Sequence, residues 1–242
     1  MSEEQLIKSI NQLLKEWNDK NHCLCHLLAR LLRVIKISDH SLHYSILSYC
    51  NLHTCKNKKY YYKLINQLIL QPSFSSYEMI SSCLLKEEDW SSSWFILSFF
   101  NLAQVFSSID CLEVFKNCTF EELLVCISEK DTIMLSVVIS LLNYSLHTQN
   151  AIGLYFFDYL LQYYENDIDL FISMLDESPD VLLLLTTLCK LINYHLDFTD
   201  YSTLLSFLNN MLDAFIHLEK THTLSISLQP LINRISHTID SF

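Results

Sequence analysis

Glycine and proline are scarce: one glycine and three prolines stand in 242 residues. Tight hairpins, phosphate-binding loops and nucleotide-binding α/β domains need glycine at positions of positive φ, so these classes are not expected. Half of the residues are hydrophobic and 18% are charged, which is enough apolar material for a large core. The composition therefore predicts an all-α protein.

Basic residues are also few, with 16 Lys and Arg against 27 Asp and Glu and a net charge of −11. This balance does not favour nucleic acid or an anionic membrane as a partner, and a basic protein partner suits it better. Two long uncharged stretches, 90–109 and 132–157, resemble membrane spans by length. Polar residues recur at helical spacing within the first and are also present in the second, which favours buried amphipathic helices and no membrane segment.

Signals for export are lacking as well. The first residues are acidic and no long apolar run follows them, unlike a secretory signal or an Arg-rich transit peptide. Nine cysteines, an odd number, are scattered through apolar helical patterns, where a thiol acts as a small hydrophobic side chain. We expect an intracellular protein of the cytoplasm or the nucleus.

Helix-start signals occur along the whole chain. Thr119 and Glu122 have the spacing of a capping box, Asp131 precedes a long apolar pattern, and Ser178 is followed by proline. Pro230 should kink or divide a last helix that begins near Leu224. With no Gly- or Ser-rich linker between them, about 12 to 14 helices are predicted in a single domain, residues 1–242.

Four of the predicted helices end alike. Each has apolar residues immediately before an asparagine and an apolar or aromatic residue immediately after it. The segments are Ser45–His53, Phe95–Ala103, Val137–Ser145 and Thr187–His195, and their asparagines lie 50, 42 and 50 residues apart. This spacing fits stacked units of two or three helices, so the sequence predicts an irregular α-solenoid or a compact multi-helix array.

At these residues the chain resembles armadillo and HEAT repeat proteins, above all at Phe99–Ala103. The resemblance implies a concave surface on which Asn51, Asn101, Asn143 and Asn193 hold the backbone of an extended peptide. The tryptophan that importin-like repeats carry one turn earlier is replaced by Leu47, Leu97, Ile139 and Cys189, so nuclear import signals are not the expected ligand. The same asparagines can instead close their own helices through local hydrogen bonds.

Aromatic side chains suggest a second binding surface. Trp90 and Trp94 lie one helical turn apart, and three consecutive tyrosines begin at Tyr60. A later helix is crowded with aromatic rings, among them Tyr155, Phe156, Tyr159, Tyr163 and Tyr164. Helical periodicity can bury only some of these rings, so the rest can anchor a protein partner, while the core accounts for the buried ones.

Cys50, His53 and Cys55 form the best candidate metal site. Cys50 and His53 share a helical face, and thiolate and imidazole are zinc ligands, but a fourth ligand such as His43 or a partner residue would be required. Buried thiols and surface histidines are the alternative explanation. The sequence has no nucleotide-binding, serine hydrolase or zinc peptidase motif, so neither catalysis nor a cofactor is expected.

The predicted function is a noncatalytic scaffold or adaptor that binds a protein segment, basic or extended, through a helical-repeat surface. The composition resembles small fungal helical subunits, which implies a cell-cycle, chromosome or signalling complex. The alternative is a self-associating structural or bridging subunit, such as a telomeric bridge, with or without a zinc-stabilised interface. In that case one of two apolar helix faces would pack against another copy of the chain. The first face consists of Leu6, Ile10, Leu13 and Trp17, and the second of Leu24, Leu28 and Leu31.

Overall fold

A computed structural model describes most of the chain: residues 3–16, 24–34, 40–49, 58–71, 74–87, 89–105, 112–128, 131–194, 200–221 and 227–242. Within these ranges the protein has fourteen α-helices and no strand. The prediction of an all-α fold is therefore confirmed.

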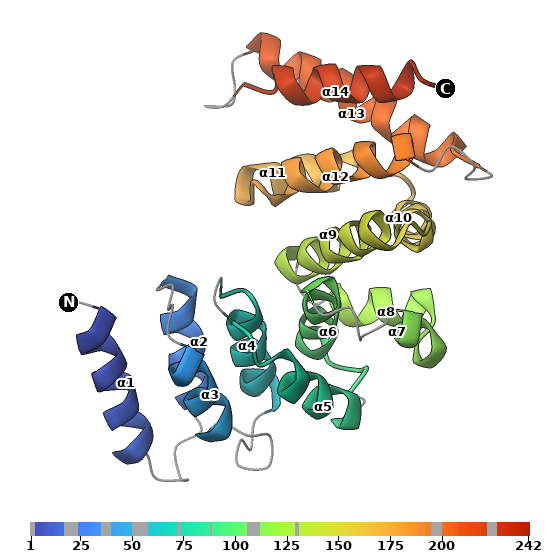
Figure 1. The fold of residues 1–242 in the computed structure, drawn as a ribbon. Coiled ribbons are helices and arrows are strands. Elements are labelled where there is room, and N and C mark those ends of the chain that lie inside the picture. The colour runs from blue at the N-terminus through green and yellow to red at the C-terminus, as the bar shows by residue number, and fades with distance from the viewer. Residues whose placement is uncertain are drawn as a thin grey trace. The chain divides into compact units, whose positions relative to one another are not determined.

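Contacts between the helices divide the chain into two compact units, Met1–Asn117 and Cys118–Phe242 (Figure 1). Each unit is described by itself, and the single domain stays a prediction. The first unit contains α1 (Glu3–Glu16), α2 (Leu24–Val34), α3 (His40–Tyr49), α4 (Lys58–Ile69), α5 (Tyr77–Glu87), α6 (Ser93–Val105) and α7 (Leu112–Asn117). The second contains α8 (Phe120–Ile127), α9 (Asp131–Thr148), α10 (Ile152–Tyr163), α11 (Ile168–Glu177), α12 (Asp180–Tyr194), α13 (Ser202–Thr221) and α14 (Gln229–Ile239).

A row of neighbouring helices runs through the first unit. α2 packs against α4 and α4 against α6, while α1 packs on α3 and α5 on α6. Aromatic rings fill the space between α4 and α6: Tyr62 meets the ring of Phe95 edge-on at 5.3 Å, and both side chains are fully buried. Burial of such large rings is the main stabilising contribution to this packing.

Part of the apolar face of each of the first two helices is covered within this unit. Ile10 of α1 and Leu24 and Leu28 of α2 are buried, and their helices pack on α3 and α4. Leu13 and Leu31 are half-buried. Trp17 lies outside the described residues.

A second row of helices, α9, α12 and α14, runs through the second unit, with α10 and α13 packed against it. Phe157 of α10, Phe171 of α11 and Phe207 of α13 meet in a cluster whose ring centroids lie 5.0 to 6.1 Å apart. All three rings are buried, so they join helices from three parts of the sequence.

Several helix starts occur where the sequence predicts them. Thr119 Oγ1 accepts from the Glu122 N–H at 3.2 Å and Glu122 Oε2 accepts from the Thr119 N–H at 2.8 Å, which completes the capping box of α8. Ser178 Oγ accepts from the Asp180 N–H at the start of α12. The prediction for Pro230 is wrong: the proline lies in the first turn of α14, where its missing N–H costs no hydrogen bond.

Candidate functional site

The four predicted asparagines are found in different surroundings. Asn101 lies in α6 and Asn143 in α9, both half-buried, whereas Asn193 lies exposed at the end of α12. Asn51 falls outside the described residues. The helices continue for four residues beyond Asn101 and five beyond Asn143, so these two asparagines do not end their helices.

Two of these amides bind a side chain on a neighbouring helix. Asn101 Nδ2 donates to Asn66 Oδ1 of α4 at 2.7 Å, and Asn193 Nδ2 donates to Thr238 Oγ1 of α14 at 3.1 Å. Asn66 and Thr238 are buried. These donors therefore serve contacts between helices of the same unit, because a buried acceptor left unpaired would destabilise the fold.

The structure also extends the series of asparagines. Asn66 in α4 follows Leu64 and Ile65, and Asn233 in α14 follows Leu231 and Ile232, the same apolar pair that precedes Asn193. Apart from Asn51, which is not described, the asparagines then stand at Asn66, Asn101, Asn143, Asn193 and Asn233, spaced by 35, 42, 50 and 40 residues. All five lie on α4 and α6 or on α9, α12 and α14, the helices of the two rows. Sequence analysis missed Asn66 and Asn233, although the pattern Leu-Ile-Asn would have found both.

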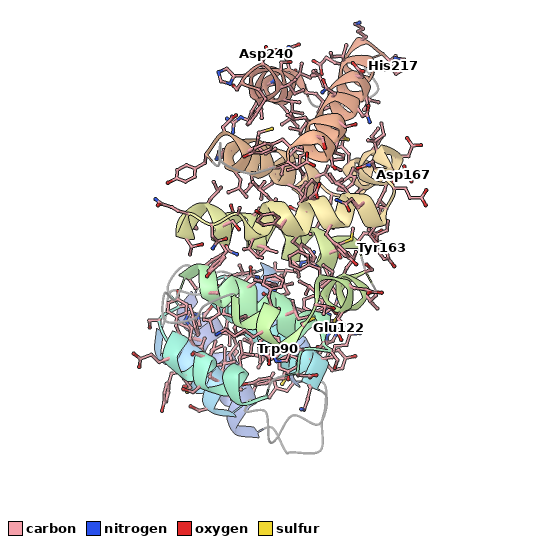
Figure 2. All side chains as sticks on the ribbon, turned by 90° about the vertical axis from the view of Figure 1, so that its right-hand side faces the viewer. Trp90, Glu122, Tyr163, Asp167, His217 and Asp240 are labelled. Atoms are coloured by element: carbon pink, nitrogen blue, oxygen red, sulfur yellow. The ribbon has the colours of Figure 1, made fainter. Side chains whose placement is uncertain are left out.

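The two tryptophans lie close to other side chains of the first unit. Trp90 is half-buried, and its ring meets Phe95 and Phe99 edge-on at 5.0 and 5.2 Å. Trp94 is half-buried as well, and the Lys63 ammonium lies 4.8 Å from its ring centre. Figure 2 labels Trp90, which lies in the turn before α6. Neither indole is among the well-exposed apolar side chains of the described residues.

Charge is distributed unequally along the sequence. Residues 1–117 contain 12 Lys and Arg against 11 Asp and Glu, a net charge of +1, whereas residues 118–242 contain 4 against 16, a net charge of −12. No Lys or Arg occurs between Lys130 and Lys190. The acidic excess of the chain therefore belongs entirely to the second unit, where a basic partner would be attracted.

One side of α10 in this unit carries exposed aromatic rings. Tyr155, Tyr159 and Tyr163 follow at intervals of four residues and so share one side of the helix; we call them the tyrosine face. Tyr155 is 46% exposed and Tyr163 is 51% exposed, while Tyr159 is half-buried. Phe156 and Phe157 of the same helix are buried. The structure thus decides which of the crowded rings belong to the core and which remain at the surface.

Neighbouring aromatic side chains pack against two rings of the tyrosine face. Tyr159 packs against Phe120 of α8 with ring centres 5.8 Å apart, and Tyr163 meets Tyr164 edge-on at 5.2 Å. The Tyr164 hydroxyl lies 3.1 Å from Ser128 Oγ, just after α8. α8 and α10 therefore lie side by side in the same direction, and α8 packs directly against Tyr159.

Acidic side chains follow directly after the tyrosine face. We call Glu165, Asp167 and Asp169 the acidic turn: Glu165 and Asp167 lie between α10 and α11, Asp169 lies in the first turn of α11, and all three are exposed. Glu165 and Asn166 have φ values of 53° and 58°, a left-handed conformation that side chains other than glycine rarely adopt. Figure 2 shows Glu122, Tyr163 and Asp167 along one edge of the second unit.

One carboxylate beside the tyrosine face is partly removed from water. Asp158 is half-buried on α10; burial raises the pKa of its carboxyl group, as does the charge of Asp200, against hydrogen bonds from Thr203 and Gln162. Hydrogen bonds from the Ser202 side chain and backbone lower the pKa of Asp200. Two acids thus approach each other here, which adds to the negative potential near α10.

The candidate zinc ligands Cys50, His53 and Cys55 lie outside the described residues. In the described part of the chain no three His, Cys, Asp or Glu side chains come together in a way that could hold a metal ion. None of the described helices has the length and apolar character needed to cross a membrane.

Comparison of the chain with protein-family models, with curated proteins and with solved structures finds no match.

Proposed function

We propose that this protein is a noncatalytic scaffold or adaptor that holds a basic segment of a protein partner. The observation that carries the proposal is the concentration of charge, −12, in residues 118–242. A strongly acidic surface speeds the encounter with a basic partner and discriminates against acidic ones. Nucleic acid is repelled by the same field, which favours protein as the partner.

Helix stability alone does not account for this charge. Anions stabilise the first turn of a helix and cations stabilise the last turn by similar amounts. In the second unit α8, α9, α11 and α12 have acidic residues in the first turn. Yet α8, α10, α11 and α12 have no basic residue in the last turn. The missing cations would have been equally favourable, so their absence supports a role of the charge in binding.

The two rows of helices support a scaffold. Stacked helices bury their apolar faces against their neighbours and leave an extended outer surface for a partner. The amide donors of Asn101 and Asn193 are used between helices, which makes the charged surface of the second unit a better candidate for the contact than an asparagine ladder.

The test is binding of the full chain to two synthetic peptides of equal length, one rich in lysine and arginine and one rich in glutamate. We expect the full chain to bind the basic peptide, and the affinity to fall as the salt concentration rises, because screening weakens contacts between exposed charges. Failure to bind the basic peptide at low salt, or equal binding of both peptides, would overturn the proposal.

Matched single variants locate the contact in the second unit. Glu165→Gln and Asp213→Asn each remove one exposed charge from that unit, and Glu78→Gln removes one from the first. Each single change in the second unit should weaken binding of the basic peptide more than the change at Glu78. A loss at Glu78→Gln as large as that of both other variants would contradict a contact in the second unit.

A further inference from the structure

We propose that the tyrosine face and the acidic turn together form the docking surface for an arginine-rich segment of the partner. This inference rests on the proposed function and assigns it to one place: Tyr155, Tyr159 and Tyr163 of α10, followed by Glu165, Asp167 and Asp169. The rings supply flat apolar surface, and the carboxylates supply opposite charge at one end of it.

Arginine fits this combination better than lysine. A guanidinium group stacks on an aromatic ring and donates two parallel hydrogen bonds to a carboxylate, whereas an ammonium group is a compact and strongly hydrated charge. Tyr155 and Tyr163 expose 46% and 51% of their surface, so both present ring area that a guanidinium can cover. The surface therefore selects arginine by shape as well as by charge.

The spacing of the rings fits an extended peptide. Successive tyrosines of the face are four residues apart, which is about 6 Å along a helix axis. Alternate side chains of an extended chain lie about 7 Å apart and point to the same side. Arginines at every second position of the partner segment would therefore reach successive rings, and the next one would meet the acidic turn.

Two of the three rings are packed against other side chains before binding. Tyr159 is held by Phe120, and Tyr163 is held by Tyr164, whose hydroxyl reaches Ser128 after α8. Rings that are already ordered lose little entropy when a ligand covers them.

Helix stability explains only part of the negative charge in the acidic turn. Asp167 Oδ1 accepts from the Asp169 N–H at 2.9 Å and so caps α11, whose first turn also favours Asp169. Glu165 has no such role: it follows the C-terminal end of α10, where the helix dipole disfavours an anion. A partner cation would compensate the charge at this position.

The test measures binding of two labelled peptides to the full chain, one with arginine and one with lysine alternating with alanine. Tyr155→Ala combined with Tyr163→Ala removes both exposed rings, and Tyr194→Ala removes a tyrosine of equal exposure, 52%, from α12 as the matched control. Binding of the arginine peptide should weaken about tenfold in the double variant and less than about twofold in the control, from two exposed cation–π contacts. The chain should also prefer arginine to lysine by about threefold, and the double variant should lose this preference.

A second double variant is the control for a loss of binding caused by unfolding. Tyr155→Phe with Tyr163→Phe keeps both rings and should bind the arginine peptide as the unchanged chain does. Weakening by Tyr194→Ala equal to that of the tyrosine pair, or no preference for arginine in the unchanged chain, would overturn this site while leaving the proposed function intact.

Two other results are decisive. If the unchanged chain binds neither peptide, the proposed function itself fails. If the unchanged chain dimerises in sedimentation and the alanine pair is monomeric, a second copy occupies the tyrosine face, and the arginine-rich partner is refuted.

Discussion

Replacement of Gly153, the one glycine of the chain, by alanine should destabilise the second unit. Gly153 lies in the first turn of α10, where α10 approaches α9, and its N–H donates to Ser145 Oγ at 2.8 Å. An ideal Cβ at this position would lie 2.8 Å from Ser145 Oγ, 3.1 Å from Leu142 Cα and 3.2 Å from the Leu141 carbonyl oxygen. Two of these three neighbours are backbone atoms of α9, so the helices themselves must separate.

Two opposing effects determine the size of the change. Alanine is favoured over glycine inside a helix by about 1 kcal/mol. Overpacking a tight contact costs about 1–3 kcal/mol. Here the Ser145 hydroxyl cannot rotate away without giving up its bonds to the Gly153 N–H and to Asn150, which adds about 1 kcal/mol. We therefore expect a net loss of about 2 kcal/mol, or about 4–8 °C in Tm for a chain of this size.

Thermal unfolding followed by far-ultraviolet circular dichroism measures this loss. Ser145→Ala should also destabilise, because the buried Gly153 N–H then lacks its acceptor, while Ser136→Ala, the same change on the partly exposed side of α9, should have little effect. Gly153→Ala with a Tm equal to or above that of the unchanged chain would refute the proposed close approach of α9 and α10.

Three further predictions concern other contacts. Glu165→Gly should raise the free energy of unfolding by about 0.5 kcal/mol, measured by urea unfolding, because glycine adopts the left-handed φ of 53° without strain. If the acidic turn binds the basic peptide, the same change should weaken that binding. A lower free energy of unfolding would contradict the account of this turn. Asn101→Ala should destabilise the first unit by about 1–3 kcal/mol, because it leaves the buried Asn66 Oδ1 unpaired. Leucine at both Asn66 and Asn101 should cost less stability in the same assay. A neutral Asn101→Ala would show that the hydrogen bond to Asn66 is dispensable. The capping hydrogen bonds from Thr119 lower the pKa of Glu122, so their contribution to the stability of α8 should be complete above about pH 4.5, the ordinary pKa, and be lost as the pH falls through the lowered value. Glu122→Gln should remove this part of the acid sensitivity of α8, measured by hydrogen exchange at several pH values. An unchanged pH profile would contradict this account.

The all-α class and many helix boundaries could be predicted from the sequence because they depend on local interactions. The Thr119 and Glu122 capping box, the start of α12 after Ser178 and the scarcity of glycine each act within a few residues. Pro230 shows the limit of this reasoning: proline is compatible with the first turn of a helix as well as with a kink, and only the position of the helix start distinguishes the two.

The surface could be predicted only in part. The unequal charge of the two parts and the rings of Tyr155, Tyr159 and Tyr163 are present in the sequence, but periodicity alone does not say which ring of α10 meets the core. Packing decides this: Phe156 and Phe157 are buried against α8, α11 and α13, which leaves Tyr155 and Tyr163 exposed. In the same way the pattern around Asn101 and Asn193 is visible in the sequence, whereas their partners Asn66 and Thr238 lie 35 and 45 residues away and meet them only through the tertiary packing of the helices.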